Sequence, residues 1–148
     1  MKTLKRVLCM ILALLTIGSL GACGVNGKPT EAPSLNPVEL AKLKLKEAYD
    51  VCCEGSKTEY AKLGYDRMSL TIDTNPEDTY SSAKKCEKDA ISAIQVINLY
   101  LGLPSSLMER ISSTRAMDGT QSQNCGTYTA TWNYHPDNGL KIIYEVNP

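Results

Sequence analysis

The chain contains no phenylalanine, one tryptophan and one histidine among its 148 residues. Aromatic packing must therefore come from the eight tyrosines and from Trp132. The lone His135 lacks the further ligands that a metal site needs, and no Cys-x-x-Cys spacing is present for zinc. The sequence also lacks a phosphate-binding loop, a dinucleotide-binding fingerprint and a nucleophile elbow. These absences predict no metal, no cofactor and no catalytic residue.

The amino-terminal residues have the composition of an export signal. Lys2, Lys5 and Arg6 precede an uncharged, largely apolar run over residues 7–20. A helix of fourteen residues is roughly 21 Å long, whereas the hydrocarbon core of a bilayer is about 30 Å thick. The run is therefore short for a transmembrane helix, and the small residues at positions 21 and 22 suit cleavage by a signal peptidase.

The segment Leu20-Gly21-Ala22-Cys23 resembles the lipobox of bacterial lipoproteins, in which a leucine and two small residues precede the modified cysteine. The resemblance covers residues 1–23, and it implies a diacylglyceryl thioether on Cys23 and cleavage after Ala22. It predicts a protein outside the cytoplasm with the membrane as a partner, because two or more acyl chains hold a protein firmly at a bilayer. The alternative is an ordinary secretory signal that happens to end before a cysteine.

Two further segments of the chain are distinctive, residues 113–119 (STRAMDG) and residues 132–140 (WNYHPDNGL). In these segments the folded part of the chain resembles small uncharacterised lipoproteins of Gram-positive bacteria. It implies no activity, because no activity is attached to these motifs.

The expected organisation is a signal peptide over residues 1–22, a lipidated cysteine with a flexible tether over residues 23–36, and one domain over residues 37–148. The tether has two glycines and two prolines and shows no hydrophobic period. Three of the 16 basic residues leave with the signal, so 13 remain against 16 acidic residues, a net charge near −3. This charge argues against nucleic acid as a partner, since nucleic-acid binding needs a basic face.

Four cysteines remain in the expected domain: Cys52, Cys53, Cys86 and Cys125. An exported protein can form disulfides. Cys52 and Cys53 cannot both face one partner, because successive side chains of a helix point about 100° apart. Two interpretations stay open, one disulfide from Cys86 to Cys52 or Cys53, or buried thiols throughout.

The hydrophobic pattern of the domain predicts an α+β fold. Asn36 and Pro37 suit a helix start, and residues 66–74 alternate as in a half-buried strand. A long helix is expected to begin at Asp78 or Thr79 and to end near Leu101. The first helix is expected to end at Gly55 and to bury an apolar stripe of Leu40, Leu43, Ala48, Val51 and Cys52. A short helix is expected from Ser56 until Gly64 stops it, and another over residues 104–112. Three further strands are expected over residues 115–123, 127–134 and 140–146.

The last two strands are expected to form a β-hairpin around Asp137-Asn138-Gly139, since Gly139 suits a positive φ. The register expected from this loop puts the apolar side chains of both strands on one face. Its pairs are Pro136–Leu140, Tyr134–Ile142 and Trp132–Tyr144. The predicted architecture is a group of helices packed on one face of an antiparallel sheet of about four strands.

Two stretches carry more polar and aromatic side chains than packing requires, residues 114–121 and residues 132–139. On neighbouring strands they could form a binding site for an anion, a sugar or a peptide end. The candidate ligand-binding residues are Arg115, Asp118, Gln121, Trp132 and His135. The alternatives are structural: an ion pair or turn contact between Arg115 and Asp118, and a core position for Trp132.

Three functions are compatible with this sequence. The main prediction is a binding module that presents its sheet or hairpin to an envelope protein, a peptide or a glycan, with an exposed aromatic patch centred on Trp132 or a tyrosine. A structural or accessory lipoprotein of an envelope complex would instead have a flat polar surface without a ligand-sized pocket. A small hydrolase would hold a serine or an aspartate within hydrogen-bond reach of His135 in a pocket.

Overall fold

The structure, a computed structural model, describes residues 36–53 and 59–148. The expected signal peptide, Cys23, nearly all of the tether and Gly55 lie outside the described residues. The elements in chain order are α2 (Pro37–Cys53), β1 (Ala61–Leu63), β2 (Ser69–Asp73), α3 (Tyr80–Tyr100), α4 (Ser105–Ser113), the 3₁₀ turn η1 (Ala116–Asp118), β3 (Gln121–Asn124), β4 (Tyr128–His135) and β5 (Gly139–Val146).

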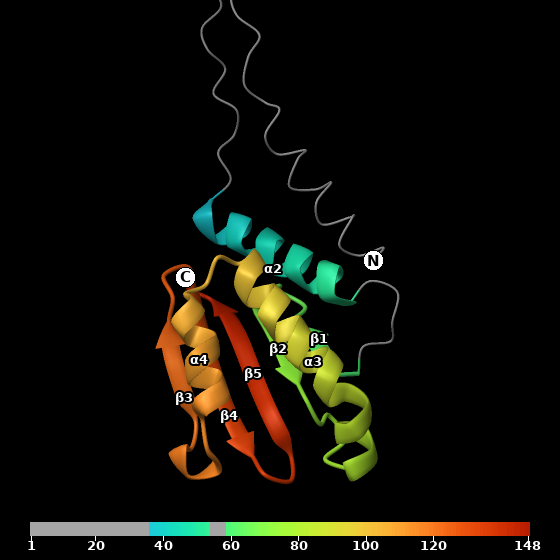
Figure 1. The fold of residues 1–148 in the computed structure, drawn as a ribbon. Helices are drawn as coiled ribbons and strands as arrows, with labels where there is room; N and C mark the ends of the chain where they lie inside the picture. Colours follow the sequence, from blue (N-terminus) through green and yellow to red (C-terminus); the bar gives the residue numbers. More distant parts are fainter. Residues whose placement is uncertain (1–35, 54–58) are drawn as a thin grey trace, which may run out of the picture. The chain divides into compact units, whose positions relative to one another are not determined.

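The strands form one antiparallel sheet of five strands in the order β1-β2-β5-β4-β3 (Figure 1). This confirms the predicted α+β class and the carboxy-terminal hairpin, while the sheet has five strands instead of about four. The additional strand is β1, in a segment where a short helix was expected. Gly64 closes the turn that follows it, because its N–H donates to the carbonyl of Ser69 at 2.8 Å. The turn folds β1 back onto β2, so the helix expectation is wrong for residues 61–63.

The strand expected over residues 115–123 is also wrong in its first half. Residues 116–118 form η1, and β3 begins only at Gln121. The Asp118 carboxylate accepts the backbone N–H of Arg115 at 2.7 Å, which turns the chain, and Gly119 follows at φ +64°. A local side-chain hydrogen bond of this kind competes with strand pairing.

The hairpin of β4 and β5 has a different register from the expected one. His135 pairs with Gly139, Tyr134 with Leu140 and Trp132 with Ile142, so the expected Trp132–Tyr144 pairing is wrong. The loop is residues 136–138, and Gly139 at φ +77° is already the first residue of β5. The difference is two residues along one strand, which keeps every side chain on its expected face because a strand has a period of two.

The sheet places one set of alternating side chains in the core. Tyr128, Trp132 and Tyr144 belong to this set and are buried. Each donates a hydrogen bond to a helical segment: Tyr128 Oη to the Ala41 carbonyl at 3.1 Å, Trp132 Nε1 to Thr114 Oγ1 after α4 at 2.8 Å, and Tyr144 Oη to Asn98 Oδ1 of α3 at 2.7 Å. The aromatic packing therefore depends on tyrosine and tryptophan, and each polar tip has a partner.

The helices α3 and α4 begin and end close to the expected residues. Thr79 caps α3, since its Oγ1 accepts the N–H of Ser82 at 3.1 Å. In α2 the expected buried stripe is partly wrong, because Leu40 and Leu43 are 45% and 36% exposed. The buried residues of α2 are Ala41, Leu45, Ala48 and Cys53. Small Ala41 lets the backbone of α2 approach Tyr128 of the sheet, which turns the two leucines outward.

The thiols Cys52, Cys86 and Cys125 are free, so the structure lacks the disulfide considered between Cys86 and Cys52 or Cys53. Burial raises the pKa of the Cys52 thiol to about 12, which favours its protonated form. None of the described helices is both long enough and apolar enough to cross a bilayer.

Candidate functional site

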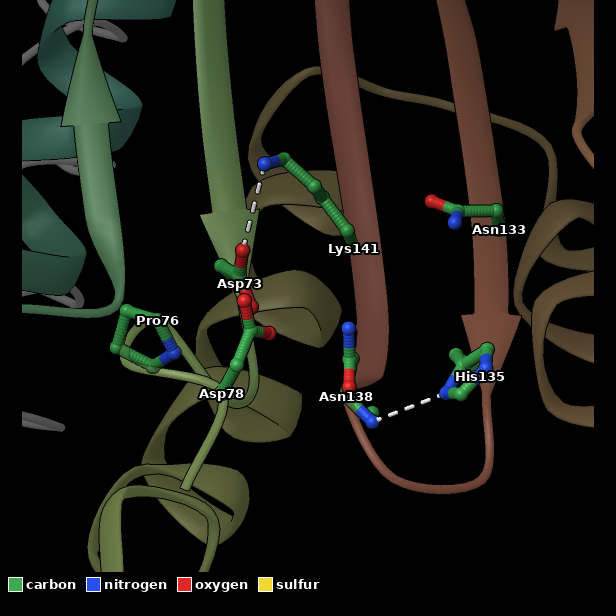
Figure 2. A pocket seen from close by; sticks show the side chains of 8 residues that line it. Asp73, Pro76, Asp78, Asn133, His135, Asn138 and Lys141 are labelled. Carbon is green, nitrogen blue, oxygen red and sulfur yellow. Dashed lines mark hydrogen bonds and ion pairs between the residues drawn. The ribbon is translucent and has the colours of Figure 1, made fainter.

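A polar pocket of about 290 Å³ lies where the β4–β5 hairpin meets the loop between β2 and α3. We call it the hairpin pocket. Figure 2 shows Asp73, Pro76 and Asp78 on one side of it, Asn133 and His135 on the other, and Lys141 and Asn138 between them. Its lining residues are Asp73, Pro76, Asp78, Asn133, His135, Asn138, Gly139 and Lys141.

The strand register brings the sheet residues of the pocket together. Asp73 of β2 pairs with Lys141 of β5, and Lys141 pairs with Asn133 of β4. Directly paired residues share a face of the sheet, and these three belong to the set opposite the buried side chains. Lys141 Nζ lies 3.5 Å from Asp73 Oδ2, so the ion pair bridges two strands at the pocket (Figure 2).

Two buried polar residues hold the loops that border the pocket. Thr74 exchanges two hydrogen bonds with Leu140, donating its N–H to the carbonyl at 2.9 Å and accepting the Leu140 N–H on Oγ1 at 2.7 Å. Asn75 donates from Nδ2 to the Asp137 carbonyl at 3.0 Å and accepts the N–H of Thr79 on Oδ1 at 3.1 Å. The hairpin loop is thereby fixed to the start of α3, so the pocket is preformed.

Gly139 is required at the contact between these loops. Its φ of +77° is strained for residues with a side chain, and an added Cβ would overlap Thr74 Oγ1. The sequence expectation of a positive φ at Gly139 is confirmed, and the structure adds the close approach of Thr74 as a second reason for glycine.

His135 stabilises the hairpin loop. Its Nδ1 accepts the N–H groups of Asp137 and Asn138 at 3.2 and 3.4 Å. An Nδ1 that accepts hydrogen bonds belongs to the neutral imidazole that carries its proton on Nε2. His135 therefore offers a donor at Nε2, while Nδ1 is engaged by the backbone.

Several polar groups of the pocket are unused. Within the described part of the chain, the side chains of Asp78, Asn133 and Asn138 form no hydrogen bond or ion pair. Asp78 also has a φ of +51°, an unusual backbone conformation for a residue other than glycine. The pocket can thus supply one unpaired carboxylate and two amides to a ligand.

A second depression, of about 340 Å³, lies beside the end of α4 and β3. Its polar groups are largely paired with one another. Gln121 Nε2 donates to the Asp118 carbonyl at 2.6 Å, and Thr114 Oγ1 accepts from Trp132 and donates to the Arg110 carbonyl at 2.8 Å. We therefore favour the hairpin pocket as the candidate site.

The five residues proposed from sequence are divided between these two places. Asp118, Gln121 and Trp132 line the second depression, and His135 lines the hairpin pocket. Arg115 is exposed and lines neither; its Nη2 lies 3.9 Å from Asp118 Oδ1, in agreement with the structural alternative.

The sequence interpretation missed Asp73, Asp78, Asn133, Asn138 and Lys141 as pocket residues. Asn133 and Asn138 lie inside the stretch it singled out. Asp73 and Lys141 could be joined only by the pairing of β2 with β5, for which the sequence has no local signal.

The geometry bears on parts of two functional expectations. Trp132 is 3% exposed, so it is not the centre of a surface patch, and the tyrosine named as its alternative stays a prediction. Asp137 Oδ2 lies 3.9 Å from His135 Nδ1, beyond hydrogen-bond distance, and no serine is among the described residues that line the hairpin pocket. Residues 36–53 and 59–148 contain no group of three His, Cys, Asp or Glu side chains that could hold a metal ion.

Comparison of this chain with protein-family models, with curated proteins and with solved structures finds no significant match, so its function has to be argued from the site itself.

Proposed function

We propose that the protein is a lipid-anchored lipoprotein of the bacterial cell envelope and that its folded domain is a binding module. The observation that carries the binding proposal is the hairpin pocket, where Asp78, Asn133 and Asn138 have unused hydrogen-bonding groups. These groups stand beside loops held by buried Thr74 and Asn75. A preformed site loses little conformational entropy when a ligand binds.

The arrangement of the helices supports an accessible site. We propose that α2, α3 and α4 pack on one face of the sheet, because Tyr128, Tyr144 and Trp132, which share a face, contact α2, α3 and the residue after α4. The paired residues Asp73, Lys141 and Asn133 lie on the opposite face. A polymer that runs along this face can then enter the pocket without displacing a helix.

The anchor rests on the segment Leu20-Gly21-Ala22-Cys23 and on the export signal before it. Residues 24–36 can span at most roughly 40 Å when extended. A domain on such a tether can reach polymers and proteins that lie beyond the lipid headgroups.

The test captures envelope material with the native lipoprotein in detergent. We expect an envelope glycan or peptide to bind the wild type and to be lost when Asn133→Ala and Asn138→Ala are combined. Gln121→Ala, in the second depression, is the matched control and should bind as the wild type does. If the combined Asn133→Ala and Asn138→Ala variant (the pocket variant) captures as much material as the wild type, the hairpin pocket is not the binding site. If Gln121→Ala abolishes capture, the binding site is the second depression.

The alternative role, an accessory lipoprotein of an envelope complex, makes a different prediction in the same experiment. It predicts recovery of one protein in a fixed ratio to the bait, with no effect of the pocket variant.

A further inference from the structure

We infer that the hairpin pocket binds a sugar-sized polyol that carries a protonated amino group, with the Asp78 carboxylate as its counter-ion. The inference deepens the proposed binding function and rests on it, since it names the chemical class of ligand for the same pocket.

The charges around the pocket favour a cation. Two carboxylates, Asp73 and Asp78, line it, and the one cation among its lining residues is Lys141. A cleft with an excess of one charge attracts ligands of the opposite charge. An anionic ligand would meet two carboxylates and one ammonium group that is already paired with Asp73, so the pocket selects against it.

Asp78 is the carboxylate left for the ligand. Both oxygens of Asp73 are engaged, Oδ1 by the N–H of Asn75 at 3.0 Å and Oδ2 by Lys141 at 3.5 Å. Asp78 has no such partner within the described residues, and its own N–H is held by the Asn75 carbonyl at 3.0 Å. A charge-assisted hydrogen bond from an ammonium group to Asp78 would satisfy it.

The remaining groups suit hydroxyls. The amides of Asn133 and Asn138 each contribute donors and an acceptor, which matches hydroxyl groups that both donate and accept. His135 adds a donor at Nε2, because its Nδ1 is occupied by the loop backbone. The volume of about 290 Å³ lies at the lower end of small-molecule sites, which fits one sugar residue better than a longer ligand.

The test titrates the mature lipoprotein in detergent with glucosamine, and with glucose as a neutral probe of the same shape. We expect glucosamine to bind more tightly than glucose by up to about fivefold, the upper limit for an ion pair to an exposed carboxylate such as Asp78. Asp78→Asn should bring glucosamine down to the affinity of glucose. Asp89→Asn, the same change on an exposed part of α3, should leave both affinities unchanged.

The possible results bear differently on the inference and on the proposed function. Equal affinity for the two sugars in the wild type, or an amine preference that survives Asp78→Asn, overturns the inference. If glucosamine does not bind while envelope material is still captured through Asn133 and Asn138, the inference fails and the proposed function stands. If the combined Asn133→Ala and Asn138→Ala variant changes neither the capture of envelope material nor the affinity for glucosamine, both the inference and the proposed function fail.

Discussion

At the scale of single residues, Gly139 carries two constraints at once. Gly139→Ala should lower the free energy of unfolding by more than 2 kcal/mol, because it adds overlap with Thr74 Oγ1 to the roughly 1–2 kcal/mol cost of a positive φ. Gly126 has a similar φ of +82° with no atom near an added Cβ, so Gly126→Ala should show the backbone cost alone. Urea unfolding of both variants measures the difference, and equal losses would show that Thr74 moves aside freely.

Tyr144 joins the sheet to α3 through a buried hydrogen bond. Tyr144→Phe removes the hydroxyl and leaves Asn98 Oδ1 without its donor, which should cost about 1–3 kcal/mol of unfolding free energy. Tyr134→Phe, at a 40% exposed position, is the control and should change stability by less than about 0.5 kcal/mol. A silent Tyr144→Phe would mean that Asn98 finds another donor in the core.

The buried tyrosines also predict an alkaline loss of stability. Burial raises the pKa of Tyr128 and, more strongly, of Tyr144 above the usual 10.0, so their ionisation is easier in the unfolded chain. The unfolded state then binds fewer protons, and the free energy of unfolding falls as pH rises above about 10. Urea unfolding from pH 8 to 11 measures this slope, which should be shallower for Tyr144→Phe. A slope unchanged by Tyr144→Phe would exclude Tyr144 as its source.

At the scale of elements, the N-cap residue of α3, Thr79, donates its N–H to Asn75, which also holds the hairpin loop beside the pocket. Thr79→Ala removes the acceptor for the Ser82 N–H and should cost about 1 kcal/mol of unfolding free energy. Ser81→Ala, on the exposed first turn, should be neutral within about 0.5 kcal/mol. Thermal unfolding compares them, and an equal effect of the two variants would contradict the cap.

The elements with local signals could be predicted from sequence. The start of α3 next to Thr79, the alternation of β2 and β4 and the positive φ of Gly139 each depend on neighbouring residues, and each agrees with the prediction. The short strand β1 could not be predicted, because three residues are too few to show a hydrophobic period. Its pairing with β2 is decided by the turn at Gly64. The hairpin register was missed because both registers put the same side chains in the core.

The site was predictable only in part for the same reason. His135, Asn133 and Asn138 fall in one hairpin, within a stretch that the sequence analysis singled out, although only His135 was predicted as a ligand-binding residue. Asp73 and Lys141 are 68 residues apart in the sequence, and the pairing of β2 with β5 brings them together. The apolar Leu40 and Leu43 of α2 are exposed since Ala41 packs on Tyr128 instead, a choice made by tertiary contact.

At the scale of the whole molecule, the proposed lipoprotein is a folded domain tethered to a lipid on Cys23, which lies outside the described residues. The domain supplies a pocket with an excess of carboxylates, and removal of the proposed signal peptide would leave 13 basic against 16 acidic residues. Electrostatic attraction of such a chain to anionic lipids would be weak, and we propose that retention at the membrane depends on the acyl chains.

The intact mass of the protein purified from its native membrane is the measurement that tests this account most directly. We predict a chain that begins at Cys23 and carries the added mass of a diacylglyceryl group, and a Cys23→Ala variant without it that leaves the membrane fraction. A native chain that still begins at Met1, without acyl groups and in the cytosol, would contradict the anchor and the envelope role together.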